Sequence, residues 1–167
     1  MTREIAEDLQ CIARQEQLLQ FPSFDHASAW DLGQRLKLAC EAAQVATTIE
    51  VRLNRRTVFL YAMPGTAPAN AHWARRKRNV VEMMDQSSYA VGLAGQEEGI
   101  SMELAMGLPA ADYASHGGAF PLRVRGVGCI GVVTVSGLPS REDHSLLVQV
   151  LAQMCGVDPA QVALPMD

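Results

Sequence analysis

The segment 47–63 limits the choice of fold most strongly, because its apolar residues alternate with polar ones and the pattern then reverses at a turn. In its first half, apolar side chains recur at every second position: Ile49, Val51 and Leu53. A period of two is typical of a β-strand with one buried face. The letters "NRR" at 54–56 predict a turn, and "TVFLYAM" at 57–63 predicts the returning strand. We therefore expect a β-hairpin with one apolar and one polar face.

A second hairpin is predicted near the C-terminus, where "AFPLRV" (119–124) and "CIGVVTVSG" (129–137) flank a turn at "RGVG". Helical patterns are expected at 3–19, from a cap at Asp25 or Ser28 to about residue 43, at 70–94 with a bend near residues 87–88, at 101–106 and at 140–155. This order lacks the regular alternation of strand and helix that builds parallel sheets. We expect an α+β fold with a central antiparallel sheet of four or five strands flanked by helices, in a single domain over residues 1–167.

The composition excludes several classes of protein. A hydrophobic content of 49% with 19% charged residues is incompatible with a disordered chain. The net charge of −4 argues against nucleic acid as a partner, and no apolar run is long enough for a membrane helix. The N-terminal residues are too charged for a signal peptide, and the four cysteines form no CxxC pair. We therefore expect a cytoplasmic protein without a nucleic-acid or membrane partner.

The first polar motif is "HWARRKRN" at 72–79. His72, Arg75, Arg76 and Asn79 share one helical face, with the spacing i, i+3, i+4 and i+7. Guanidinium groups on such a face can hold a carboxylate or phosphate through paired hydrogen bonds. The alternative is a solvated or interface face, on which Arg78 would pair with Glu82 one turn later.

The second motif is "HGGAFP" at 116–121. Gly117 and Gly118 permit a positive φ, and successive backbone N–H groups in such a turn can bind an anion. His116 is then available to bind a metal or haem iron, or to transfer a proton near neutral pH. The alternative is a turn in which His116 is only structural.

The third motif is "SGLPSREDH" at 136–144. Ser140 and Asp143 have the spacing of an acidic capping box at the start of a helix. His144 would lie in the first helical turn, where the neutral imidazole is favoured and can bind a ligand. No two histidines have metal-ligand spacing, so we expect no metal site, and no nucleophile motif points to a catalytic residue.

These three motifs resemble the haem-degrading-domain family (GlcG/HbpS-like), and in particular its uncharacterised branch of small bacterial and fungal proteins. The resemblance extends over nearly the whole chain. It implies a profilin-like α-β-α sandwich and a homo-oligomer, either a dimer or a ring of dimers. It also implies haem as a cofactor or ligand, but it transfers no catalytic residue to this sequence.

Three functional hypotheses follow. The first is a cytoplasmic oligomeric protein that binds a small anionic molecule, either haem through its propionates or a metabolite carboxylate, between the Arg75 and Arg76 face and the His116 loop. The second is an enzyme that binds and degrades haem, with His116 or His144 as the axial ligand. The third is a non-catalytic oligomeric interaction module. The predicted ligand-binding residues are His72, Arg75, Arg76, Asn79, His116, Gly117, Gly118 and His144.

Overall fold

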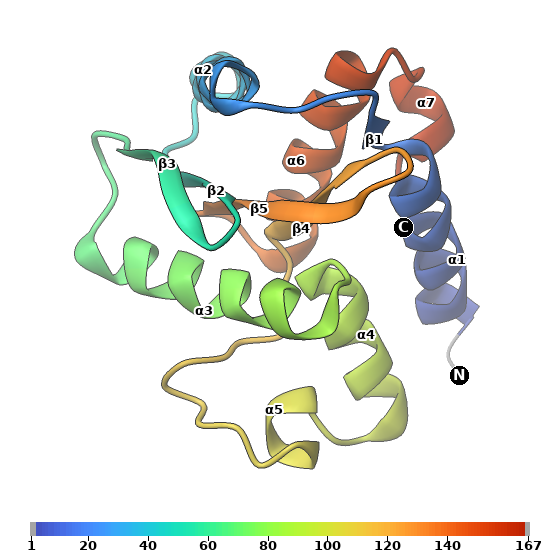
Figure 1. Ribbon diagram of the computed structural model, residues 1–167. Coiled ribbons are helices and arrows are strands. Elements are labelled where there is room, and N and C mark those ends of the chain that lie inside the picture. The colour runs from blue at the N-terminus through green and yellow to red at the C-terminus, as the bar shows by residue number, and fades with distance from the viewer. Residues whose placement is uncertain (1–2, 166–167) are drawn as a thin grey trace.

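Two antiparallel hairpins form most of a five-stranded sheet in the computed structural model, which describes residues 3–165 (Figure 1). The first hairpin joins β2 (Thr48–Leu53) to β3 (Arg56–Ala62), and the second joins β4 (Ala119–Val124) to β5 (Gly128–Ser136). Strands β2 and β5 pair antiparallel in the middle, so the strand order is β1-β4-β5-β2-β3. Both predicted hairpins and the α+β class are confirmed.

One edge of the sheet differs from the predicted antiparallel pattern. The two-residue strand β1 (Gln20–Phe21) pairs with β4 in parallel, so the sheet is mixed. Such a short strand carries no periodic signal in the sequence, because two residues cannot display alternation.

Helices cover both faces of the sheet (Figure 1). Helices α2 (His26–Ala42) and α6 (Ser140–Cys155) lie on one face, and α3 (Pro68–Met84) lies on the other. Helix α1 (Arg3–Leu18) packs against α4 (Ser88–Glu98) and the short α7 (Pro159–Val162) near the β1 edge. Helix α5 (Met102–Ala105) follows α4. No helix within residues 3–165 has the length and apolar character to cross a bilayer.

The main core lies between the sheet and the pair α2 and α6, and the alternating residues of β2 contribute to it. Ile49 and Val51 are completely buried, as their period predicts. The opposite face of β2 is buried as well, because α3 covers it: Thr48 is 1% exposed and Glu50 is 7% exposed. The predicted polar face of this hairpin is therefore an interior face, on which Glu50 is satisfied by Arg78.

The predicted long helix at 70–94 is two helices. Helix α3 ends at Met84, and its C-cap residue Asp85 has a left-handed backbone with φ of 56°. Ser87 then caps α4 by accepting a hydrogen bond from the backbone N–H of Ala90. The predicted cap of α2 is confirmed at Asp25, which forms a reciprocal capping box with Ser28.

Candidate functional site

Parts of the three polar motifs meet in one open cleft of about 300 Å³. The cleft lies where the N-terminal half of α3, the loop before β4 and the segment from β5 into α6 converge. Its lining residues are Asn70, Trp73, Lys77, His116, Ser136, Gly137, Leu138, Pro139 and Ser140. We call this feature the His116 cleft.

His116 is the imidazole of this cleft. Its Nδ1 atom lies 3.4 Å from the hydroxyl oxygen of Ser140, and its ring packs edge-on against Trp73 at 5.3 Å. Its Nε2 atom has no hydrogen-bond partner within residues 3–165. Desolvation lowers the pKa of His116, and the positive charges of Lys77 and Arg76 act in the same direction, while the Glu103 carboxylate opposes them. The ring is therefore neutral at pH 7, since the ordinary histidine pKa of 6.5 already lies below that pH.

A buried ion pair forms the floor of the cleft. The Lys77 ammonium donates to a carboxylate oxygen of Asp143 over 2.7 Å, and the two side chains are only 5% and 0% exposed. Asp143 also accepts the backbone N–H groups of Gly137 and Leu138. Burial raises the pKa of Asp143, and the Lys77 charge opposes this shift. The pair therefore joins α3 to the start of α6 across the end of β5.

The predicted capping box at the start of α6 is wrong. Pro139 is the N-cap residue, and no side chain caps this end of the helix. Asp143 lies one position too deep in the helix to cap it, and its carboxylate instead binds the backbone of 137–138 and Lys77.

The two glycines of the "HGG" loop permit close packing and do not line the cleft. A Cβ atom at Gly117 would overlap the backbone carbonyl oxygen of Ser140. Gly118 has φ of +128°, and a Cβ atom there would lie 2.9 Å from Nζ of Lys77. These glycines allow the loop to contact α6 and the ion pair, which holds His116 at the cleft.

The α3 face that was predicted to bind an anion forms hydrogen bonds with the segment 110–112 of the same chain. Arg75 donates to the Asp112 carboxylate over 3.0 Å, and Arg76 donates to a carbonyl oxygen in the segment 110–112 over 2.9 Å. Asn79 donates to the backbone carbonyl of Asp112 over 2.8 Å. None of the three side chains lines the His116 cleft. Their donors are used to attach the loop before His116 to α3.

Two further residues of the "HWARRKRN" motif lie away from the cleft. His72 is exposed and is absent from the cleft lining. The alternative prediction paired Arg78 with Glu82, but Arg78 pairs with Glu50 on β2 over 2.8 Å. Glu82 instead lies 3.4 Å from Arg52.

His144 lies in the core and not in the cleft. Its Nε2 atom is 2.8 Å from the Gln15 side-chain oxygen, and its Nδ1 atom has no hydrogen-bond partner. The ring packs between Tyr89 and Phe120, at centroid distances of 5.1 and 5.9 Å. Burial lowers the pKa of His144 to about 3. The side chain is completely buried, so a ligand could reach this imidazole only if the surrounding packing opened.

The buried His144 predicts a loss of stability in mild acid. In the unfolded chain a histidine binds a proton near pH 6.5, whereas the folded protein keeps His144 neutral until about pH 3. The free energy of unfolding therefore falls with decreasing pH in this window, by about 1.4 kcal/mol per pH unit. Urea unfolding at about pH 6.5 and about pH 5 measures this slope. His144→Leu is expected to flatten it, and the exposed-site control His72→Ala is expected to retain it. An equal slope in His144→Leu would contradict the assignment.

Several cleft residues were not predicted from the sequence. Asn70, Trp73 and Lys77 lie on one helical face with the spacing i, i+3 and i+7, and this spacing was the available signal. The prediction chose Arg75 and Arg76 on the neighbouring face instead. No group of three or more histidine, cysteine, aspartate or glutamate side chains in residues 3–165 could hold a metal ion.

Comparison with known proteins identifies the family. The family model described as "Haem degrading protein HbpS-like" matches residues 24–152. The UPF0303 protein of Azotobacter vinelandii is 57% identical over 148 residues, which cover 89% of each chain. The chain belongs to the HbpS-like haem-degrading family. The resemblance found in the sequence is thereby confirmed.

Solved structures show the same fold. The crystal structure of the Ybr137w protein is 25% identical and superposes with a TM-score of 0.79, covering 89% of this chain and 87% of that chain. The crystal structure of a PduOC:heme complex is 17% identical, with a TM-score of 0.65, and covers 79% of this chain and 94% of that chain. At that identity the second similarity concerns the fold alone.

Proposed function

We propose that this protein binds a small anionic molecule in the His116 cleft. One observation carries the proposal: the neutral imidazole of His116, with its Nε2 atom unpaired among the described residues, lies beside Lys77 in an open cleft. The volume of about 300 Å³ is at the lower end of the range for small-molecule sites. The donors differ from those expected from the sequence, because Arg75 and Arg76 are used within the chain.

The electrostatics of the cleft favour a negative group. Among the charges near His116, Lys77 has the largest effect on its pKa and lowers it, which means that Lys77 raises the positive potential at the ring. Glu103 opposes this shift, and Arg76 adds to it. The 16-residue helix α6 begins at Ser140 in the cleft wall, and no side chain caps that end. The N-terminus of a helix carries a partial positive charge and attracts anions. A carboxylate or phosphate group is therefore the chemistry that suits this cleft.

Haem is the second candidate ligand. The family description names haem degradation, and one protein of the same fold has been solved as a heme complex. A neutral imidazole with its Nδ1 near Ser140 and its Nε2 unengaged suits an iron ligand, so the residues present fit the group. His116 would hold the iron, and bound haem would supply the oxygen chemistry of a degrading enzyme. The cleft volume suits an edge of the porphyrin rather than the whole ring.

The test is calorimetric titration of the whole protein with haem and, separately, with small dicarboxylates and inorganic phosphate. His116→Ala is expected to weaken binding at least about tenfold, because it removes a central polar contact. His72→Ala is the matched control, since this exposed histidine of the HWARRKRN motif lies outside the cleft. Unchanged binding in His116→Ala, or no binding of any of the three probes, would overturn the proposal.

Spectroscopy separates the two candidates. If haem is the ligand, its Soret band shifts on mixing with the wild-type protein and not with His116→Ala. If the protein also degrades haem, the band bleaches when a reductant and oxygen are added. Binding of a dicarboxylate or phosphate without a Soret shift would assign the cleft to a metabolite.

We propose further that the protein acts in the cytoplasm as a homo-oligomer, a dimer or a ring of dimers. The family resemblance supports the assembly, and the reduced cysteines of the described chain suit a reducing compartment.

A further inference from the structure

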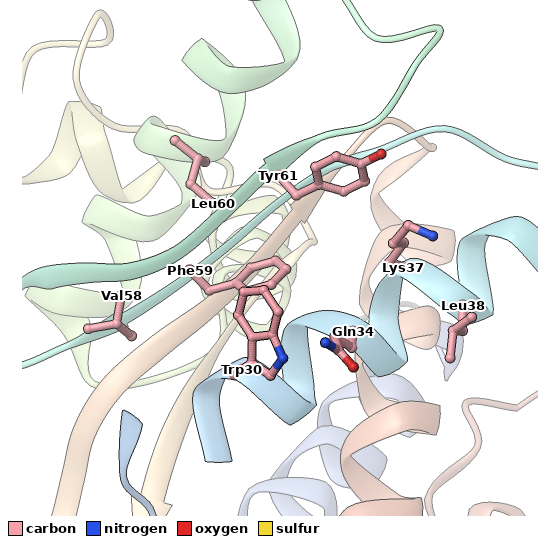
Figure 2. Close-up of a pocket in the computed structure, with 8 residues that line it drawn as sticks. All are labelled: Trp30, Gln34, Lys37, Leu38, Val58, Phe59, Leu60 and Tyr61. Carbon is pink, nitrogen blue, oxygen red and sulfur yellow. The ribbon is translucent and has the colours of Figure 1, made fainter. Parts of the chain in front are cut away.

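An apolar groove lies between α2 and the outer strand β3, on the face of the sheet opposite α3 (Figure 2). Its volume is about 560 Å³. It is lined by Trp30, Gln34, Lys37, Leu38, Val58, Phe59, Leu60 and Tyr61. Three of these apolar side chains are unusually exposed: Trp30 at 60%, Leu38 at 59% and Leu60 at 62%. Exposed apolar side chains that gather in one place mark an interaction site more often than scattered ones do.

The groove is built into the packing of α2 on the sheet. Gly33 has no side chain, and the ring of Phe59 occupies the space that a Cβ atom would need. Trp30 packs edge-on against this ring at a centroid distance of 5.7 Å, so its indole stands on the surface (Figure 2). Aromatic side chains in such a position are typical of the centre of a protein interface.

The edge of the sheet beside the groove is open. Strand β3 pairs with β2 on one side and with no other strand of residues 3–165 on the other. Its register places Tyr61 and Phe59 opposite Ile49 and Val51 on the α2 face, whereas Leu60 points to the other face. An open edge with apolar residues on both faces is a template for pairing with another strand.

We propose that this groove and the β3 edge bind a second copy of the same chain across a twofold axis. An identical strand can pair antiparallel with β3 and continue the sheet, since a twofold interface joins the same surface on both subunits. The Leu60 side chains then approach each other near the axis, and each Trp30 contacts the partner's groove. Such pairing removes both the open edge and the exposed apolar side chains from water.

The charges around the groove favour a second copy over a charged partner. The exposed face of α2 carries two ion pairs, Arg35 with Asp31 at 3.0 Å and Lys37 with Glu41 at 2.5 Å. The charges of each pair cancel, so the α2 side of the groove meets no net repulsion from an identical face, and it offers a strongly acidic or basic partner no net attraction. The six apolar and aromatic lining residues suit the centre of an interface of about 20–30 residues a side, with these ion pairs at its rim.

This inference specifies the assembly part of the proposed function and is independent of its ligand part. The groove lies against α2, whereas α3 contributes three residues to the wall of the His116 cleft, and no residue lines both. A change in the groove is therefore expected to alter the molecular mass in solution without altering binding in the cleft.

The experiment is light scattering coupled to size-exclusion chromatography, with the double variant Leu38→Glu/Leu60→Glu. The wild-type protein is expected to be dimeric or larger at about 0.1 mM. Two buried carboxylates are expected to raise the dissociation constant of the groove contact at least about tenfold and to lower the mass. The matched control is Leu104→Glu on α5, because Leu104 is 72% exposed and lies outside the groove.

A wild-type protein that is monomeric at that concentration overturns the inference, and so does a double variant of unchanged mass. A drop in mass in Leu104→Glu equal to that of the double variant also overturns it. Circular dichroism shows whether each variant is folded, and Leu60→Ser replaces the double variant if that variant is not. A wild-type protein that is dimeric or larger but binds none of the ligand probes would count against the cleft alone.

Discussion

Replacing Lys77 with methionine is expected to lower the free energy of unfolding by about 3–5 kcal/mol, because it leaves the buried Asp143 carboxylate without its counter-charge. Methionine preserves most of the aliphatic volume, so the loss reports the missing charge and not a cavity. The remaining donors to Asp143 are two backbone N–H groups, from Gly137 and Leu138. Two such hydrogen bonds do not replace an ammonium 2.7 Å away. Urea unfolding at pH 7 is the measurement.

Two comparisons keep this result interpretable. Arg35→Met removes an exposed ion pair with Asp31 and is expected to cost less than about 1 kcal/mol. The double variant Lys77→Met/Asp143→Asn is expected to be more stable than Lys77→Met alone, because asparagine carries no charge to bury. If Lys77→Met costs no more than Arg35→Met, the ion pair does not contribute as described.

Gly117→Ala is expected to cost about 3 kcal/mol and to displace His116 from the cleft. The added Cβ atom would overlap the backbone carbonyl oxygen of Ser140, which cannot rotate away as a side chain can. The loop or the start of α6 has to move instead. Ligand binding is therefore expected to fall together with stability, which urea unfolding and the titration described above would measure.

The control for this variant is Gly126→Ala in the β4–β5 turn. Gly126 has φ of +76° and open space where a Cβ atom would lie. Alanine there is strained but meets no neighbour, so about 1 kcal/mol is expected with no effect on binding. Equal losses at the two glycines would show that backbone conformation, and not the contact with Ser140, makes Gly117 necessary.

The fold was largely predictable because its strongest signals are local. The alternation at Ile49 and Val51 predicted β2, and a cap at either Asp25 or Ser28 predicted the start of α2, which the structure places after Asp25. The prediction failed where local patterns were short or continuous: β1 has two residues, and the helical pattern runs through Asp85, where the chain turns. The polar side of β2 was misread as solvent-exposed, because a strand pattern cannot show that α3 covers that face.

The candidate site was less predictable than the fold. Of the eight predicted ligand-binding residues, only His116 lines the cleft. Arginine in a helical stripe has the same sequence pattern whether it binds a ligand or the chain's own carbonyl groups. Arg76 does the latter, across more than 30 residues of sequence. His144 has the same spacing in a first helical turn whether it faces a cleft or the core.

The residues alone were sufficient for the α+β class, the two hairpins and the family, because periodicity, turn chemistry and characteristic motifs act over a few residues. The tertiary structure decided which donors remain available to a ligand. Lys77 meets Asp143, and Arg75 meets Asp112, only because the packing of α3 against β5 and the loop before His116 brings distant segments together. A charged group that is paired within the fold stabilises the folded chain, whereas an unpaired polar group at an open cleft is available to a ligand. That difference depends on burial and distance in the folded protein, which no local pattern encodes.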